Sequence, residues 1–217
     1  MTLVSMIAFG GAILAAVIGL PQYLLVVRTK DTHGLSLTAW IIAVGTGAGW
    51  LGHGIRIGEI HMIWPNIWGL FVAFTILYYL RRNKHYTSYL KLWPGLALAG
   101  LLFTLDAFIG SAAFGIAIMI PQVYGILRQG VALMKAPQVT GVSLATWIFQ
   151  LLCQSLWLVW AIMTSEPGTL ICATVSAIAC TFTLTWRILR AIGFGPIGNF
   201  RRQPSNHLAE GEPSVVD

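Results

Sequence analysis

The segments Gly19-Leu20-Pro21-Gln22-Tyr23 and Met119-Ile120-Pro121-Gln122-Val123 each close a long apolar run, and a short basic loop follows each of them. The next apolar run opens with Gly34-Leu35-Ser36-Leu37-Thr38-Ala39-Trp40 in the first case and with Gly141-Val142-Ser143-Leu144-Ala145-Thr146-Trp147 in the second. A repeat of this kind determines the architecture of a chain. The matched segments predict two copies of one structural unit.

The composition is that of a membrane protein. Of the 217 residues, 57% are hydrophobic and 9% are charged, whereas soluble domains carry about 25% charged residues. Such a chain has too few charges to cover a globular surface in water, which excludes a soluble enzyme, a disulfide-stabilised secreted domain and a disordered chain. Because the basic residues stand between apolar runs, the net charge of +6 reflects orientation in the membrane and not nucleic-acid binding.

Six apolar runs predict seven helices that cross a bilayer, and each crossing takes about 20 residues. The run from Leu92 to Leu127 is too long for one crossing, so it predicts two helices that turn near Asp106 to Gly110, the first starting around Tyr86. The other five spans are predicted at residues 1–27, 34–55, 60–80, 139–163 and 168–189. The predicted fold class is all-α, an integral membrane protein with seven transmembrane helices.

The basic residues also predict the orientation. With the N-terminus outside, twelve of the thirteen Lys and Arg lie in inside segments, and only Arg56 lies outside. Cytoplasmic loops carry such an excess of Lys and Arg. We therefore predict a multi-pass protein of the plasma (cytoplasmic) membrane with its N-terminus outside and its C-terminus in the cytoplasm. Residues 191–217 are predicted to be a disordered cytoplasmic tail.

The repeat divides the chain into units. Residues 1–82 are predicted to form the first three-helix repeat, 83–106 a linker helix, 107–190 the second three-helix repeat, and 191–217 the tail. Because three crossings reverse the chain direction, two such units share an orientation only with one more crossing between them. The repeats are therefore parallel and related by an axis along the membrane normal, an arrangement known among transporters.

Two prolines and three glycines have predicted structural roles within the spans. Pro21 and Pro121 each remove a backbone hydrogen bond, so a kink and a hinge are predicted at both. The neighbouring amides of Gln22 and Gln122 are available to the carbonyls that the prolines release. A second group comprises Gly45, Gly49 and Gly52, which are predicted to let helices approach closely. The G-x-G-x-x-G pattern over residues 47–52 lies within a span and is not a dinucleotide loop.

The paired Pro-Gln motifs, with Arg28–Leu37 and Gly141–Leu144, resemble those of PQ-loop proteins. The three-plus-one-plus-three layout is similar to that of the SWEET sugar transporters, and the resemblance covers residues of about 4 to 190. It implies a transporter fold and a small-molecule solute. PQ-loop relatives handle sugars, amino acids and cystine, and the KDEL receptor shares the fold, so the resemblance leaves the solute open.

The resemblance also implies where a solute binds. In the sugar-carrying members a tryptophan of the second helix and an asparagine of the third line the pocket, and Trp50 and Asn66 match that pair. Trp157 matches in the second repeat, but Ala173 stands where a second asparagine is expected. An indole offers a broad apolar face and an amide bonds hydroxyls. We therefore predict that Trp50, Asn66 and Trp157 bind the substrate.

Titratable groups are few in the apolar spans. Asp106, Glu59 and Glu166 fall near the outer ends of spans, where solvation explains them, so no buried acidic pair is expected to carry protons. This favours facilitated diffusion. His53 is open to two interpretations, a pH-responsive residue of the pathway or, with Glu59 and His61, part of a metal site. We expect no metal and no cofactor.

The chain offers no nucleophile with a base and an orienting partner, so it is not expected to be an enzyme. We expect a facilitative, alternating-access transporter of a small neutral polar solute, with sugar-like solutes preferred. Two alternatives remain open: a PQ-loop transporter of amino acids or another metabolite, and a receptor or scaffold of the same fold that does not transport. The expected partners are the solute and the lipid bilayer. The oligomeric state stays open.

Overall fold

The computed structural model describes residues 2–32, 35–83, 86–135 and 143–197. The motif glycines Gly34 and Gly141 and most of the predicted tail, 198–217, lie outside the described residues. Within the described ranges the chain forms helices and no strand. The helices are α1 (Leu3–Thr29), α2 (Leu37–Ile57), α3 (Ile60–Arg82), η1 (Tyr89–Leu92), α4 (Trp93–Thr104), η2 (Leu105–Ile109), α5 (Ser111–Lys135), α6 (Leu144–Thr164) and α7 (Pro167–Ala191).

The repeated sequence motifs begin equivalent helices. Ser36 and Ser143 are the N-caps of α2 and α6, and the hydroxyl of each accepts a hydrogen bond from the backbone N–H three residues on. Glu59 and Glu166 cap α3 and α7 in the same way, with a carboxylate in place of the hydroxyl. Side-chain acceptors at these positions satisfy backbone donors that a helix start leaves free. The Gly-x-Ser-Leu motif therefore marks where the second helix of each repeat starts.

The helices are those of a multi-pass membrane protein. Within the described residues, six helical segments are long and apolar enough to cross a membrane, namely α1, α3, the segment Tyr89–Ile109, α5, α6 and α7. At 21 residues, α2 is as long as α6, but its glycines, His53 and Arg56 make it less apolar. Large apolar side chains such as Phe74 and Ile178 remain exposed on the outside of the bundle, as expected of a surface that faces lipid.

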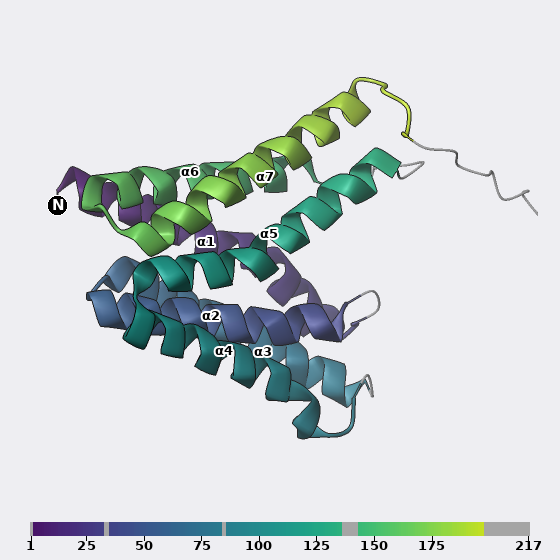
Figure 1. Ribbon diagram of the computed structural model, residues 1–217. Helices are drawn as coiled ribbons and strands as arrows, with labels where there is room; N and C mark the ends of the chain where they lie inside the picture. Colours follow the sequence, from purple (N-terminus) through teal and green to yellow (C-terminus); the bar gives the residue numbers. More distant parts are fainter. Residues whose placement is uncertain (1, 33–34, 84–85, 136–142, 198–217) are drawn as a thin grey trace, which may run out of the picture.

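The helices run side by side in one bundle (Figure 1), and the two repeats have the same internal order. In the first repeat α3 packs against both α1 and α2, and in the second α7 packs against both α5 and α6. The repeats meet where α1 contacts α6 and where α2 contacts α5, while α4 packs on α2. The end of the bundle that holds Thr2, the α2–α3 and α6–α7 turns and the α4–α5 corner is called the amino-terminal end below.

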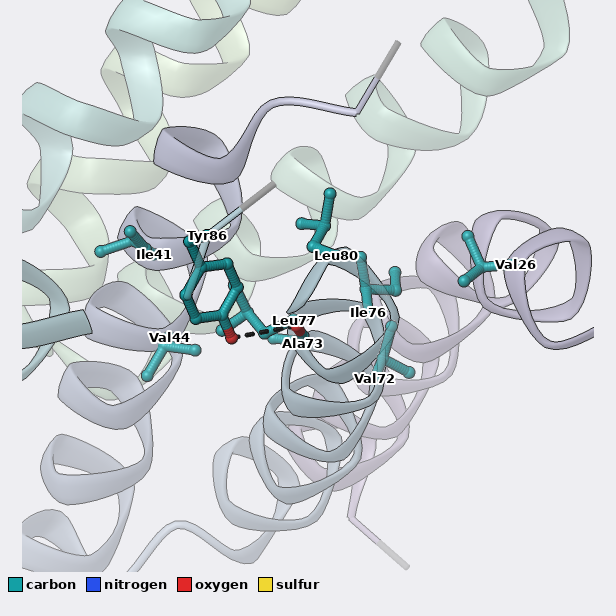
Figure 2. Packing of buried hydrophobic residues seen from close by; sticks show 9 residues of the cluster. All are labelled: Val26, Ile41, Val44, Val72, Ala73, Ile76, Leu77, Leu80 and Tyr86. Carbon is teal, nitrogen blue, oxygen red and sulfur yellow. Dashed lines mark hydrogen bonds between the residues drawn. The ribbon is translucent and has the colours of Figure 1, made fainter. Parts of the chain in front are cut away.

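The linker helix differs from its prediction at its start. The expected helix around Tyr86 begins instead at Tyr89, with a short 3₁₀ turn before α4. Tyr86 is buried between α2 and α3, where its hydroxyl donates to the Leu77 carbonyl at 3.0 Å (Figure 2). The buried ring holds the segment between α3 and α4 against the bundle. The residues from Tyr86 to Ser88 are therefore not helical, and they connect α3 to the start of η1. The predicted turn near 106–110 is present, at the π-helical η2 and at Gly110, where φ is +117°.

Small residues set the closest helix contacts. A Cβ added to Gly45 would lie 2.8 Å from the Gly95 carbonyl oxygen of α4, and one added to Gly49 would lie 2.7 Å from a methyl carbon of Leu102. The prediction that Gly45 and Gly49 let helices approach is confirmed, and their partner is the linker helix. In the second repeat Gly115 of α5 lies directly against Gly168 of α7. Such glycine contacts are typical of helices packed in membranes.

Candidate solute-binding cavity

A cavity of about 480 Å³ lies between the two repeats. It falls within the roughly 300–1,000 Å³ usual for small-molecule pockets. All six repeat helices line it, and the linker helix does not. The lining residues include Thr46 and Trp50 of α2, Asn66 of α3, Gln122 of α5, Gln150, Gln154 and Trp157 of α6, and Cys172 and Ala173 of α7.

The two predicted tryptophans both line the cavity, one from each repeat. Trp50 meets Phe114 of α5 edge to face, with ring centroids 5.0 Å apart. Trp157 packs against Gly11 of α1, where an added Cβ would lie 3.2 Å from the indole, and it meets Trp160 at 5.7 Å. Each indole is therefore held by a contact with the other repeat. Rigid aromatic walls of this kind suit the flat apolar face of a small solute.

Asn66 lines the cavity, and one of its amide hydrogens is already used. Its Nδ2 donates to the Met62 carbonyl at 2.7 Å. The Asn66 Oδ1 and the second amide hydrogen are left for a solute. The preceding Pro65 also lines the cavity, and α3 remains a continuous helix through it.

The Pro-Gln motifs contribute unequally. Pro21 and Pro121 lie within continuous helices, and neither lines the cavity. Gln122 does line it, but its Nε2 donates to the Ser176 hydroxyl of α7 at 3.0 Å. The expectation that the Gln122 amide serves a carbonyl released by Pro121 is therefore wrong. The Gln122 side chain instead ties α5 to α7 within the second repeat.

Sequence reasoning missed Gln150 and Gln154, which extend the polar wall of the cavity. They lie four residues apart on α6, and Trp157 follows three residues after Gln154. Residues three and four apart share one face of a helix. This i, i+4, i+7 pattern of two amides and an indole was a signal available in the sequence. No charged or histidine side chain lines the cavity in the described part of the chain.

A buried charged cluster lies at the amino-terminal end of the cavity. His53 and Arg56 of α2 meet Asp106 of η2: the His53 Nδ1 lies 3.0 Å from the Asp106 carboxylate, and the Arg56 Nε and Nη2 each donate to it at 2.7 Å. The His53 Nε2 lies 3.5 Å from the Glu166 carboxylate at the start of α7. His53, Asp106 and Glu166 are 1%, 3% and 8% exposed. The cluster thus joins both repeats and the corner between them.

This burial corrects the sequence prediction. Asp106 and Glu166 were expected in solvent at the ends of spans, and no buried acidic pair was expected. The π-helical turn instead brings Asp106 inward, and Glu166 is buried as the cap of α7, where it accepts from the backbone of Gly168 and Thr169 and bonds the Ser111 hydroxyl. A buried carboxylate needs such donors. The Arg56 guanidinium compensates the Asp106 charge, and the His53 ring lies between the two carboxylates.

The proposed metal grouping of His53, Glu59 and His61 is not assembled. Glu59 bonds His61 at 2.5 Å, and its carboxylate caps α3. His53 belongs to the cluster with Asp106 and Glu166. Among the residues described, no three metal-ligating side chains form a site.

The cavity is closed at one end and continues at the other. His53 stacks on Phe114 with ring centroids 4.5 Å apart, so this pair and the charged cluster cover the amino-terminal end. Towards the opposite end, Gln122 and Gln150 line both the cavity and a second groove between α5 and α6, with Gln129 and Thr146 farther along it. The cavity is therefore continuous with this groove through Gln122 and Gln150.

Parallel three-helix repeats around a central cavity are an arrangement known among membrane transporters. Residues 2–86 match the family model described as "Sugar efflux transporter for intercellular exchange". The match spans the first repeat from its start through Tyr86. Over these residues, fewer than half of the 217 in the chain, the protein is similar to this family. A search of curated proteins finds no match.

Proposed function

We propose that the protein is a facilitative transporter of a small neutral polar solute, preferably a sugar. The observation that carries this proposal is the lining of the central cavity. Its walls combine two indoles with amide side chains, and within the described chain they hold no charged group. A sugar presents an apolar ring face for the indoles and hydroxyls for the amides. An ionised solute would enter without a compensating charge, which is costly in a site of low polarity.

The proposal includes alternating access. With the amino-terminal end outside, as the basic residues predict, the described conformation is closed outside and open towards the cytoplasm. Transport then requires the repeats to part at the charged cluster and to close at the opposite end. Binding near the midplane between rocking repeats is a common plan among transporters. The proposal includes no energy coupling although Asp106 and Glu166 are buried, because within the described chain no carboxylate or histidine lines the cavity to carry a proton with the solute. The solute then only equilibrates across the membrane.

Trp50→Ala is expected to lower solute flux about tenfold or more, because the solute loses the apolar area of the indole and, beyond that area, an aromatic contact worth roughly 1 kcal/mol. The measurement is counterflow in liposomes that contain the purified protein. Vesicles are loaded with one unlabelled solute from a panel of sugars, amino acids and organic acids, and entry of the labelled form is followed. Trp50→Phe, which keeps a ring beside Phe114, is expected to retain part of the flux.

Trp93→Ala is the matched control, because Trp93 is exposed at the start of α4 and does not line the cavity. It should transport as the unmodified protein does. Equal flux in Trp50→Ala and Trp93→Ala would remove Trp50 from the site. Flux of an amino acid in place of sugars would change the solute class, and binding without flux would favour a receptor of the same fold.

Pro121→Ala tests the hinge. Restoring a backbone N–H at this position adds a helical hydrogen bond and stiffens α5, so the maximal counterflow rate is expected to fall several-fold while the half-saturating concentration stays the same. Pro94→Ala serves as control, since Pro94 lies in the first turn of α4, where a proline interrupts no helical bond. An unchanged rate in Pro121→Ala, with the same result for Pro21→Ala, would exclude both prolines as hinges.

A further inference from the structure

Gln154 is a largely buried residue whose amide has no hydrogen-bond partner among the described residues. Its side chain lies on α6 and is only 8% exposed, yet it lines the cavity. No other described residue hydrogen-bonds its amide. Asn66 and Gln122, by contrast, each donate one amide hydrogen to the protein. The Gln154 amide is therefore open to the cavity and keeps its donors and its acceptor for a solute.

The position of Gln154 fits a ring-shaped solute. Gln154 and Trp157 are three residues apart and share one face of α6. A ring that lies against the Trp157 indole therefore has its edge beside the Gln154 amide. At the same place in the first repeat stands Gly47, which has no side chain to offer.

Gln154 also stands in for an amide that the second repeat lacks. In the first repeat the cavity amide is Asn66 on α3, whereas the equivalent position on α7 is Ala173. The second repeat thus provides its open amide from α6. The polar contacts of the two repeats come from non-equivalent helices, so they are not related by the repeat symmetry.

We propose that Gln154 is a specificity-determining residue that hydrogen-bonds two adjacent hydroxyls of an uncharged polyol. A primary amide can donate an N–H to one hydroxyl oxygen and accept the O–H of its neighbour, a pairing that a vicinal diol satisfies and a single hydroxyl does not. This inference rests on the proposed transport of a sugar-like solute and narrows it to solutes with vicinal hydroxyls.

The test compares glucose with analogues that each lack one hydroxyl, using counterflow in liposomes. In the unmodified protein, removal of a hydroxyl that Gln154 reads is expected to raise the half-saturating concentration about tenfold. Gln154→Leu keeps the bulk of the side chain and removes the amide. In this variant the half-saturating concentration of glucose itself is expected to rise by about the same factor. The same deoxy analogue should then bind as well as glucose, because the variant has nothing left to pair with that hydroxyl.

Ser155→Ala is the matched control on the same helix. The Ser155 hydroxyl donates to the Leu151 carbonyl and does not line the cavity, so this variant should keep the discrimination between glucose and its deoxy analogues. Discrimination that survives unchanged in Gln154→Leu would overturn the inference and leave the proposed function standing. If the unmodified protein moves no sugar at all, the proposed function fails and the inference fails with it.

Discussion

Gly115→Ala is expected to destabilise the folded protein by about 3 kcal/mol or more, because the added methyl group meets backbone and not a movable side chain. Its Cβ would lie 2.6 Å from the Gly168 Cα and against the Gly168 carbonyl oxygen. The α5–α7 contact would have to open, and with it the second repeat. The midpoint of thermal unfolding, followed by tryptophan fluorescence in detergent, should fall by about 10 °C.

Gly125→Ala provides the control within the same helix. Nothing lies within 4 Å of a Cβ added at Gly125, so this change should be neutral or stabilise by up to about 1 kcal/mol through helix propensity. Equal unfolding midpoints for the two variants would mean that α5 and α7 are not in contact at Gly115. A loss of stability in Gly125→Ala alone would contradict the arrangement described for α5.

Asp106→Ala is expected to weaken the closure at the amino-terminal end. The substitution leaves the buried His53 and the Arg56 guanidinium without their carboxylate, and removal of one partner from a buried ion pair costs about 3–5 kcal/mol. The lower part of that range applies, since the Arg56 side chain is 37% exposed and can turn to water. The unfolding midpoint should fall accordingly.

A second measurement separates loosening of this closure from general instability. Cys172 lines the cavity and is 1% exposed. A membrane-impermeant maleimide added outside intact cells should label Cys172 faster in Asp106→Ala than in the unmodified protein. Glu59→Gln is the control, because the Glu59–His61 pair is partly exposed and worth at most about 1 kcal/mol. Unchanged labelling in Asp106→Ala would show that Asp106 does not hold this end closed.

The fold could largely be predicted from the sequence, because its main signals are local. The lengths of the apolar runs determine the number of helices, and Ser36 and Ser143 cap α2 and α6 through bonds three residues along the chain. The start of the linker helix could not be predicted in this way. It depends on the burial of Tyr86 against α2 and α3, which is a contact between elements and leaves no periodic pattern in the sequence.

The lining of the cavity was predictable where the repeats agree and not where they differ. Trp50 and Trp157 occupy matching places, so comparison of the repeats finds both. The counterpart of Gln154 in the first repeat is Gly47, so aligning the two repeats does not identify Gln154. Asp106 was misjudged for another reason: its partner Arg56 lies 50 residues away in sequence, and a carboxylate beside a turn is indistinguishable by sequence from a solvated one.

The charged cluster limits how the two halves of the chain could be exchanged. Trp160 stands in the second repeat where His53 stands in the first, packed among Ala8, Met62 and Ala161. Asp106, the carboxylate that meets His53, lies at the α4–α5 corner, outside the duplicated helices. A protein assembled from two copies of the first repeat would place a second imidazole in that apolar setting, with no corner carboxylate to meet it. The two repeats therefore differ where they meet: the contact around His53 is polar, and the contact around Trp160 is apolar. Neither repeat can replace the other.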